Sequence, residues 1–249
     1  MHRTRDLDWD GCLNVRDLGG LPTEDGGETR FGAVVRADSV RRLSDRGWAA
    51  LVEYGVRRIV DLRWHDELEA DPPRELPVEV VHVSLFGDYD PAFGREVDAV
   101  GGAQPDEAAA TRAIYLLYLE RYAENFAGAI SAVAGAPEGP VVVHCAVGKD
   151  RTGLTIALLL RLAGVGADDV ARDYAASGEN LRGELERWAS EGETERERQR
   201  RRRLGATPAR AMRDVLDELE HRHGAAADYL RAAGAADGDL ARARARLRG

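Results

Sequence analysis

Apolar residues follow two different spacings along the chain, and the two alternate through its first two thirds. Short apolar runs predict four strands, at 33–36, 56–62, 78–85 and 141–144. The last of these, VVVH, is apolar almost throughout, which is typical of a strand buried on both faces of a sheet. Longer runs between the strands keep a spacing of about 3.6 residues and predict helices.

The helices predicted by that spacing differ in length. A helix over 44–55 has Ser44 as its cap and Gly55 as its stop. Residues 107–134 predict one long helix with a single apolar stripe. The stripe consists of Ile114, Leu117, Tyr118, Tyr122, Phe126, Ile130 and Val133. Residues 153–164 are mostly apolar all round, so that helix is expected to lie inside the molecule.

Residues that favour turns separate these elements, with a proline-rich break at 72–77 and a polar loop, FGDYDPAFG, at 86–94. The alternation of strands and helices up to residue 164 predicts the α/β class, with a central, mostly parallel sheet flanked by helices. We expect a single domain over 1–249, whose C-terminal part is helical. The charged run ERERQRRRR near residue 200 is typical of a solvated helix face.

Composition narrows the class of protein further. The 249 residues are 44% hydrophobic and carry a net charge of −9, which argues against nucleic acid as the main partner. The two cysteines, Cys12 and Cys145, lie far apart in sequence and are expected to be reduced. No His or Cys cluster has the spacing of metal ligands, so we expect neither metal nor cofactor. The chain does not begin with a secretory signal, and no apolar run is long enough to span a bilayer, so we expect a cytoplasmic protein.

The segment HCAVGKDRTG, at 144–153, contains Cys145 and the only lysine of the chain, Lys149. Because Cys145 follows a buried strand and a helix begins about six residues later, the loop amides and the helix N-terminus are expected to form an anion site. Arg151 can close the ring with its planar guanidinium, and Gly148 permits a backbone that a side chain would obstruct. The predicted phosphate-binding residues are Ala146, Val147, Gly148, Lys149, Asp150, Arg151 and Thr152.

The same surroundings favour ionisation of the Cys145 thiol at neutral pH. A thiolate beneath a bound phosphoryl group is placed for in-line attack on phosphorus, which gives a phosphocysteine. Thr152 can donate its hydroxyl to the sulfur in the second step, and His144 can hold the loop through its backbone.

HCAVGKDRTG resembles the signature of cysteine-dependent phosphatases, and its GKDRTG ending is similar to that of the bacterial atypical tyrosine/dual-specificity and phosphoinositide phosphatases. Four further blocks resemble that branch in the same order: NVRDLGG at 14–20, VRADSVRRLS at 35–44, VDLR at 60–63 and ARDYAASGEN at 171–180. The resemblance implies a metal-free phosphomonoesterase of the protein-tyrosine-phosphatase fold. It also implies, as in some members, a lid over the site, which would comprise the helices from about 179 to 249.

Lys149 has two interpretations. Family members with a lysine in this loop accept highly anionic lipid or dual-type phosphosubstrates, so the resemblance implies that Lys149 contacts substrate. Phosphorylated proteins and phosphoinositides both fit, and a lid that meets an anionic membrane is a weaker interpretation. Alternatively, Lys149 only pairs with a neighbouring carboxylate at the rim of the loop.

Cleavage of a phosphoester also needs an acid that protonates the leaving oxygen. Asp88, in the polar loop after a strand, is the first candidate, because the family pattern places an acid there. Asp90, two residues away, is the second candidate. Asp150 is the third, and it can instead bind Lys149.

Other polar groups are interpreted as structural. Asp61 and Arg63 are expected to form an ion pair, and Asn14, Arg16 and Asp17 a buried polar turn that supports the sheet. Two other functions remain open: a non-catalytic phosphate-binding module, and a sulfur-transfer or redox enzyme.

Overall fold

The structure is a computed structural model that describes residues 4–71 and 77–248. Five strands form one sheet in the order β1-β2-β5-β3-β4. Their bounds are β1 Arg16–Asp17, β2 Val34–Ala37, β3 Arg58–Asp61, β4 Glu79–His82 and β5 Val141–His144. Neighbouring strands are parallel except for β1, which is antiparallel to β2. The α/β class and the mostly parallel sheet are therefore confirmed, and the four predicted strands correspond to β2, β3, β4 and β5. The proline-rich break at 72–77 lies, except for its last residue, outside the described residues.

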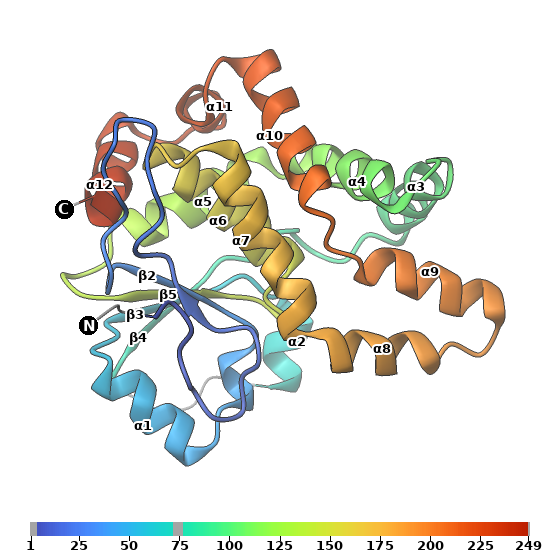
Figure 1. Cartoon of the computed structure of the whole chain (residues 1–249), viewed down its shortest axis with the longest axis horizontal. Helices are drawn as coiled ribbons and strands as arrows, with labels where there is room; N and C mark the ends of the chain where they lie inside the picture. The colour runs from blue at the N-terminus through green and yellow to red at the C-terminus, as the bar shows by residue number, and fades with distance from the viewer. Residues whose placement is uncertain (1–3, 72–76, 249) are drawn as a thin grey trace.

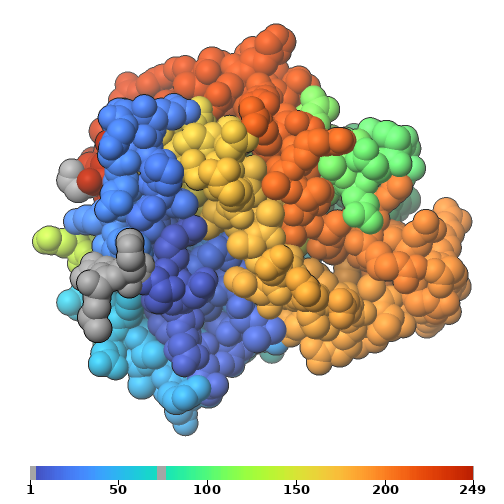
Figure 2. All heavy atoms as spheres, in the orientation of Figure 1, coloured from blue at the N-terminus to red at the C-terminus, as the bar shows by residue number. Residues whose placement is uncertain are grey.

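Helices cover both faces of this sheet. They are α1 Asp45–Glu53, α2 His65–Ala70, α3 Pro91–Gly102, α4 Glu107–Arg121, α5 Ala123–Ala134, α6 Asp150–Leu162, α7 Ala167–Asn180, α8 Arg182–Ser190, α9 Glu195–Gly205, α10 Ala209–His223, α11 Ala226–Ala232 and α12 Asp237–Arg248, with a 3₁₀ turn at Val40–Arg42. Figure 1 shows α1 on one side of the sheet and α5, α6 and α7 on the other. The pair α8 and α9 projects from the body as a helical hairpin, which is also visible in the space-filling view of Figure 2.

The apolar run of β5 lies between β2 and β3 and is covered on both faces. Val142 belongs to the smaller core, together with Trp48 and Leu51 of α1. Val141 and Val143 belong to the larger core on the opposite face. Because successive side chains of a strand point to opposite faces, a strand covered on both sides is mostly apolar, and in β5 only the last residue, His144, is polar. The helix that follows, α6, is buried almost all round, as its apolar sequence predicts.

The single long helix predicted over 107–134 is wrong, because α4 and α5 are separate helices that meet at Tyr122. This residue has φ −117° and ψ 27°, which are not helical values. Its ring packs against Phe86 and Phe93, with centroids 5.3 and 5.4 Å away. The apolar spacing continues through the break, so periodicity alone cannot reveal it.

The loop predicted at 86–94 is shorter than expected, because α3 begins within it. The Asp90 side chain caps α3 by accepting a hydrogen bond from the amide of Ala92 at 2.8 Å. Pro91 follows at the first helical position, where its missing N–H has no consequence. Among the described residues, none of the helices is both long and apolar enough to cross a membrane.

Candidate active site

The Cys145 loop, defined here as residues 145–151, connects β5 to α6 and includes the first residues of α6. Ala37 at the end of β2 and Asp61 at the end of β3 both lie beside His144 in the parallel register. The loop therefore emerges where the carboxyl ends of three strands meet, the edge at which open parallel sheets bind ligands. Cys145 lies at its base and is only 2% exposed.

The carbonyl groups of residues 146–148 are held from outside the loop. The Ser39 amide donates to the Ala146 carbonyl at 3.0 Å. Asn14 Nδ2 donates to the carbonyls of Val147 and Gly148 at 3.3 and 3.1 Å, and Arg36 Nη2 also donates to that of Gly148, at 2.7 Å. In a planar trans peptide the N–H points away from the C=O, so outward carbonyls turn the amides inward. The amides of residues 146–152 donate to no group within the described parts of the chain. They are therefore available to an anion.

Gly148 is required in this loop for two reasons. Its φ of +68° lies in the left-handed region that favours glycine. A Cβ atom at this position would lie 2.4 Å from the carbonyl oxygen of Ala37, which is backbone and cannot turn aside. The obstruction expected from the sequence is thus a close approach between the loop and the end of β2.

The side chains behind the loop are themselves fixed by Asp173 of α7. The Asp173 carboxylate accepts from Arg36 Nη1 at 2.6 Å and from Arg16 Nε at 3.1 Å, and Arg16 donates to Asn14 Oδ1 at 2.5 Å. All four residues are buried. Burial raises the pKa of Asp173, but Arg16 and Arg36 outweigh it and hold that pKa well below its ordinary value. An ionised cluster therefore links α7 to the loop.

Arg151, the last residue of the loop, is held by Glu67 of α2 and by Trp64, the residue immediately before α2. Its terminal nitrogens lie 2.5 and 3.1 Å from the two carboxylate oxygens of Glu67, a bidentate pair. Its guanidinium also stacks on the ring of Trp64, 4.7 Å from the centroid. Burial lowers the pKa of Arg151, but its interactions with Cys145 and Glu67 raise it above its ordinary value, so the guanidinium stays charged.

Two of the three candidate acids lie between β4 and α3. Asp88 is exposed, and its neighbour Tyr89 packs edge to face on Trp64 with ring centroids 6.1 Å apart. This segment therefore lies against the tryptophan that stacks on Arg151. The Asp90 carboxylate is instead occupied as the cap of α3.

The third candidate, Asp150, lies beside Lys149. The Lys149 ammonium is 3.3 Å from Asp150 Oδ1 and donates to the carbonyl of Leu204 in the last turn of α9. Asp150 Oδ1 also accepts a hydrogen bond from Tyr115 Oη at 2.8 Å. Lys149 therefore pairs with a neighbouring carboxylate, as its second interpretation predicts. It also makes a contact with α9 that neither interpretation included. Substrate contact stays a prediction.

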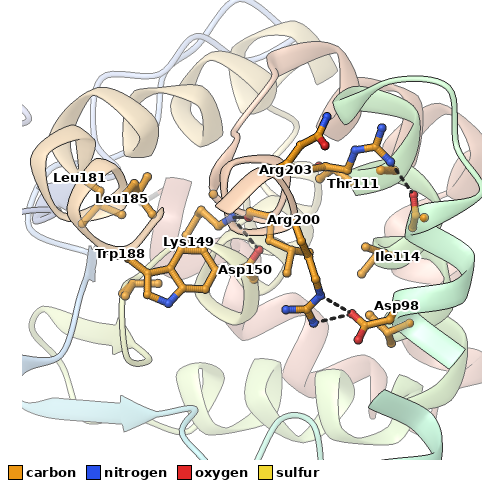
Figure 3. A pocket seen from close by; sticks show the side chains of 18 of the residues that line it. Asp98, Thr111, Ile114, Lys149, Asp150, Leu181, Leu185, Trp188, Arg200 and Arg203 are labelled. Atoms are coloured by element: carbon orange, nitrogen blue, oxygen red, sulfur yellow. Dashed lines mark hydrogen bonds and ion pairs between the residues drawn. The ribbon is translucent and has the colours of Figure 1, made fainter. Parts of the chain in front are cut away.

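A cavity of about 930 Å³ opens beside Lys149 and Asp150 (Figure 3). Helices α3 and α4 form one wall, and α8 and α9, which lie in the segment predicted as a lid, form the other. Its apolar lining includes Ile114, Leu181, Leu185 and Trp188. Arginine side chains also line it, namely Arg187, Arg196, Arg200 and Arg203.

The remaining predictions about this region have mixed outcomes. His144 Nδ1 lies 3.1 Å from the Cys145 carbonyl, as expected of a residue that holds the loop. Arg63 and Asp61 form the expected ion pair, at 2.8 Å. The Thr152 hydroxyl is buried without a hydrogen-bond partner among the described residues, so the expected bond to sulfur is not formed here.

From the sequence alone, no role is assigned to four residues that support the Cys145 loop: Arg36, Trp64, Glu67 and Asp173. Arg36 and Asp173 lie within blocks that resemble the phosphatases, so those blocks were the available signal. Trp64 and Glu67 lie outside every block, and nothing local marks them. Within residues 4–71 and 77–248, no group of three or more His, Cys, Asp and Glu side chains could hold a metal ion.

Comparison with known proteins identifies the family. The model of the tyrosine phosphatase family matches residues 7–249, so the chain belongs to this family of phosphoric monoester hydrolases. A tyrosine-protein phosphatase of Nostoc commune is 32% identical over 160 residues, which cover 61% of this chain and 50% of the relative. The triple specificity protein phosphatase PtpB of Mycobacterium tuberculosis is 30% identical over 193 residues, 69% of this chain and 68% of the relative. The match therefore spans half the length of one relative and about two thirds of the other.

Asp173→Asn should destabilise the protein strongly, because it leaves Arg16 and Arg36 buried without their counter-ion. We expect a loss of about 3–5 kcal/mol in the free energy of unfolding at pH 7, measured by urea denaturation. Since the folded-state pKa of Asp173 is lowered, its contribution is present above the unfolded value of about 3.9 and declines as pH falls below it. The difference between variant and wild type should therefore shrink below about pH 4.

The matched control is Asp168→Asn. Asp168 lies on α7, as Asp173 does, but it is exposed and pairs with Arg213 of α10. That change should cost less than about 1 kcal/mol. Equal losses in the two variants would contradict a special role for the Asp173 cluster.

Proposed function

We propose that this chain is a cysteine-dependent phosphatase that hydrolyses phosphomonoesters with Cys145 as its nucleophile. The observation that carries the proposal is the run of amides at 146–152, none of which donates to a group among the described residues, beside the buried Cys145 and Arg151. Such amides and a planar guanidinium suit the non-bridging oxygens of a phosphoryl group. In this proposal the Cys145 sulfur, at the base of the same loop, is the group that attacks phosphorus.

The reaction proceeds in two steps. The Cys145 thiolate attacks phosphorus, the S–P bond forms, and the P–O bond to the leaving group breaks as an acid protonates the leaving oxygen. Water then attacks phosphorus and gives its proton to the conjugate base. The P–S bond breaks, so that thiolate and inorganic phosphate are regenerated. Arg151 holds the phosphoryl oxygens in both steps, as electrostatic stabilisation of the transferring group requires.

We assign the acid to Asp88. Its segment packs through Tyr89 on Trp64, and Trp64 stacks on Arg151, which supports a position near the phosphoryl group. Asp88 is also exposed, whereas the Asp90 carboxylate caps α3 and Asp150 is bonded to Tyr115. Within the described residues Asp88 has no such bond to give up, so its exposed carboxylate can move onto a bound substrate.

Phosphorylated proteins with phosphotyrosine or phosphoserine/threonine, and phosphoinositides, are the proposed substrates. The cavity beside the Cys145 loop supports a substrate with both an apolar part and further negative charge, because apolar side chains and arginines line it together. The name of the Mycobacterium relative, a triple specificity phosphatase, is consistent with this breadth. In this proposal Lys149 and the arginines of α8 and α9 that line the cavity contact the further negative charge of the substrate.

Cys145→Ser should abolish turnover while retaining phosphate binding, because a serine hydroxyl is not ionised at neutral pH. We expect p-nitrophenyl phosphate hydrolysis in the presence of a chelator to fall by at least about 1000-fold. Binding of inorganic phosphate, measured by calorimetry, should persist. Full activity in this variant would exclude Cys145 as the nucleophile, and binding without turnover in the wild type would favour a phosphate-binding module.

Asp88→Asn should impair substrates with poor leaving groups more than those with good ones. An acid matters little when the leaving oxygen is a stable anion such as p-nitrophenolate, and much when it is an alkoxide. We expect a loss of about 100-fold on a phosphoserine peptide and less than about tenfold on p-nitrophenyl phosphate. Asp90→Asn is the control and should leave this ratio unchanged. A ratio that changes with Asp90→Asn or Asp150→Asn instead would reassign the acid.

Gly148→Ala should disable the loop, because the added Cβ meets the Ala37 carbonyl and the backbone has positive φ. We expect kcat/KM to fall by about 100-fold or more, since even a displacement of about 1 Å in the site can have that effect. Gly128→Ala in α5, where an added Cβ meets nothing within 4 Å, is the matched control. Normal activity in Gly148→Ala would show that the loop tolerates a different backbone.

A further inference from the structure

Asp150 places a negative charge at the rim of a loop whose amides suit anions. Its side chain is 37% exposed and lines the cavity, and it directly precedes Arg151. A carboxylate within a few ångströms of a bound phosphate dianion would weaken binding by repulsion. A free carboxylate could also turn toward the amides and the guanidinium, and would then occupy the site as an internal anion.

The contacts of Asp150 restrain one of its two carboxylate oxygens. Oδ1 accepts from Tyr115 Oη at 2.8 Å and lies 3.3 Å from Lys149 Nζ, whereas Oδ2 has no partner among the described residues. Tyr115 Oη in turn lies 2.9 Å from Tyr174 Oη. An ionised carboxylate can only accept hydrogen bonds. Tyr174 therefore donates to Tyr115, and Tyr115 donates to Asp150.

The two tyrosines are rigid and permanent donors. Tyr115 of α4 and Tyr174 of α7 are 2% and 1% exposed, and their rings meet edge to face with centroids 5.9 Å apart. Burial raises the pKa of each hydroxyl, and the charge of Asp150 raises both further. Both hydroxyls therefore stay protonated throughout the pH range in which a phosphatase of this kind works.

We propose that Tyr115, supported by Tyr174, is a positioning residue that holds the Asp150 carboxylate away from the anion-binding face of the Cys145 loop. The inference rests on the proposed function, because it concerns the phosphate site of that function. Lys149 Nζ lies 3.3 Å from the same oxygen (Figure 3). Without the Tyr115 hydroxyl, the carboxylate keeps only its contact with Lys149, and it can rotate more easily toward the Cys145 loop and compete with phosphate.

The test is binding of inorganic phosphate to Tyr115→Phe, measured by calorimetry, with KM and kcat for p-nitrophenyl phosphate beside it. We expect phosphate to bind about tenfold more weakly and KM to rise by a similar factor, with kcat changed less than about threefold. Adding Asp150→Asn should restore phosphate binding to within about twofold of the wild type, because an amide no longer repels the dianion. A purely structural role of Tyr115 predicts no such rescue.

Tyr229→Phe is the matched control. Tyr229 is also buried, and its hydroxyl donates to the Leu119 carbonyl at 2.7 Å, away from Asp150. This variant loses a comparable hydrogen bond and should keep wild-type phosphate binding. If Tyr115→Phe does not fold, as judged by thermal unfolding, Tyr174→Phe provides the test, with an expected weakening of about threefold and the same rescue.

The inference is overturned if the tyrosine variant binds phosphate like the wild type, or if Asp150→Asn does not restore binding. A wild-type protein that neither binds phosphate nor hydrolyses the ester overturns the proposed function and this inference with it. Turnover that survives Cys145→Ser contradicts the nucleophile alone.

Discussion

The site depends on the hydrogen bonds that hold the carbonyl groups of residues 146–148 to side chains and backbone outside the Cys145 loop. A loop can present its amides to a ligand only if its carbonyls find partners elsewhere, because buried backbone groups are rarely left unpaired. Here the partners are Ser39, Asn14 and Arg36, which lie more than 100 residues before the loop. The proposed anion site therefore depends on the whole sheet edge as well as on the signature sequence.

That arrangement has an energetic cost, and the rest of the fold offsets it. Burying the guanidinium of Arg36 would be strongly unfavourable without a counter-ion, and Asp173 of α7 supplies one. Arg16 shares the same carboxylate and orients Asn14. Helix α7 thus stabilises the loop without touching a ligand, which gives the block at 171–180 a physical role. At the other end of the loop, Glu67 is the counter-ion of the buried Arg151 in the same way.

The parts of the fold that could be predicted are those that leave a local pattern. β5 is buried on both faces and α6 almost all round, so their sequences are mostly apolar. Cys145 and Arg151 are only six residues apart, so their spacing can be read directly from the sequence. The break at Tyr122 leaves no such pattern, since aromatic packing sets it. The start of α3 does have local signals, the Asp90 cap and Pro91, but the same residue types are also typical of turns. The pairings of Arg36 with Asp173 and of Lys149 with Leu204 join distant segments, which no periodicity encodes.

The single lysine of the chain shows how one residue can serve two requirements. The Leu204 carbonyl lies in the last turn of α9, where backbone acceptors lack helical partners and the helix dipole is negative. A compact ammonium with three donors can meet this carbonyl and Asp150 together, whereas the rigid, planar fork of arginine would need more room in a buried position. Lys149 therefore fixes the wall of the cavity formed by α9 to the loop that is proposed to bind phosphate. The width of the cavity and the charge at its base depend on the same side chain, so the proposed function would make substrate selection and anion binding depend on Lys149 together.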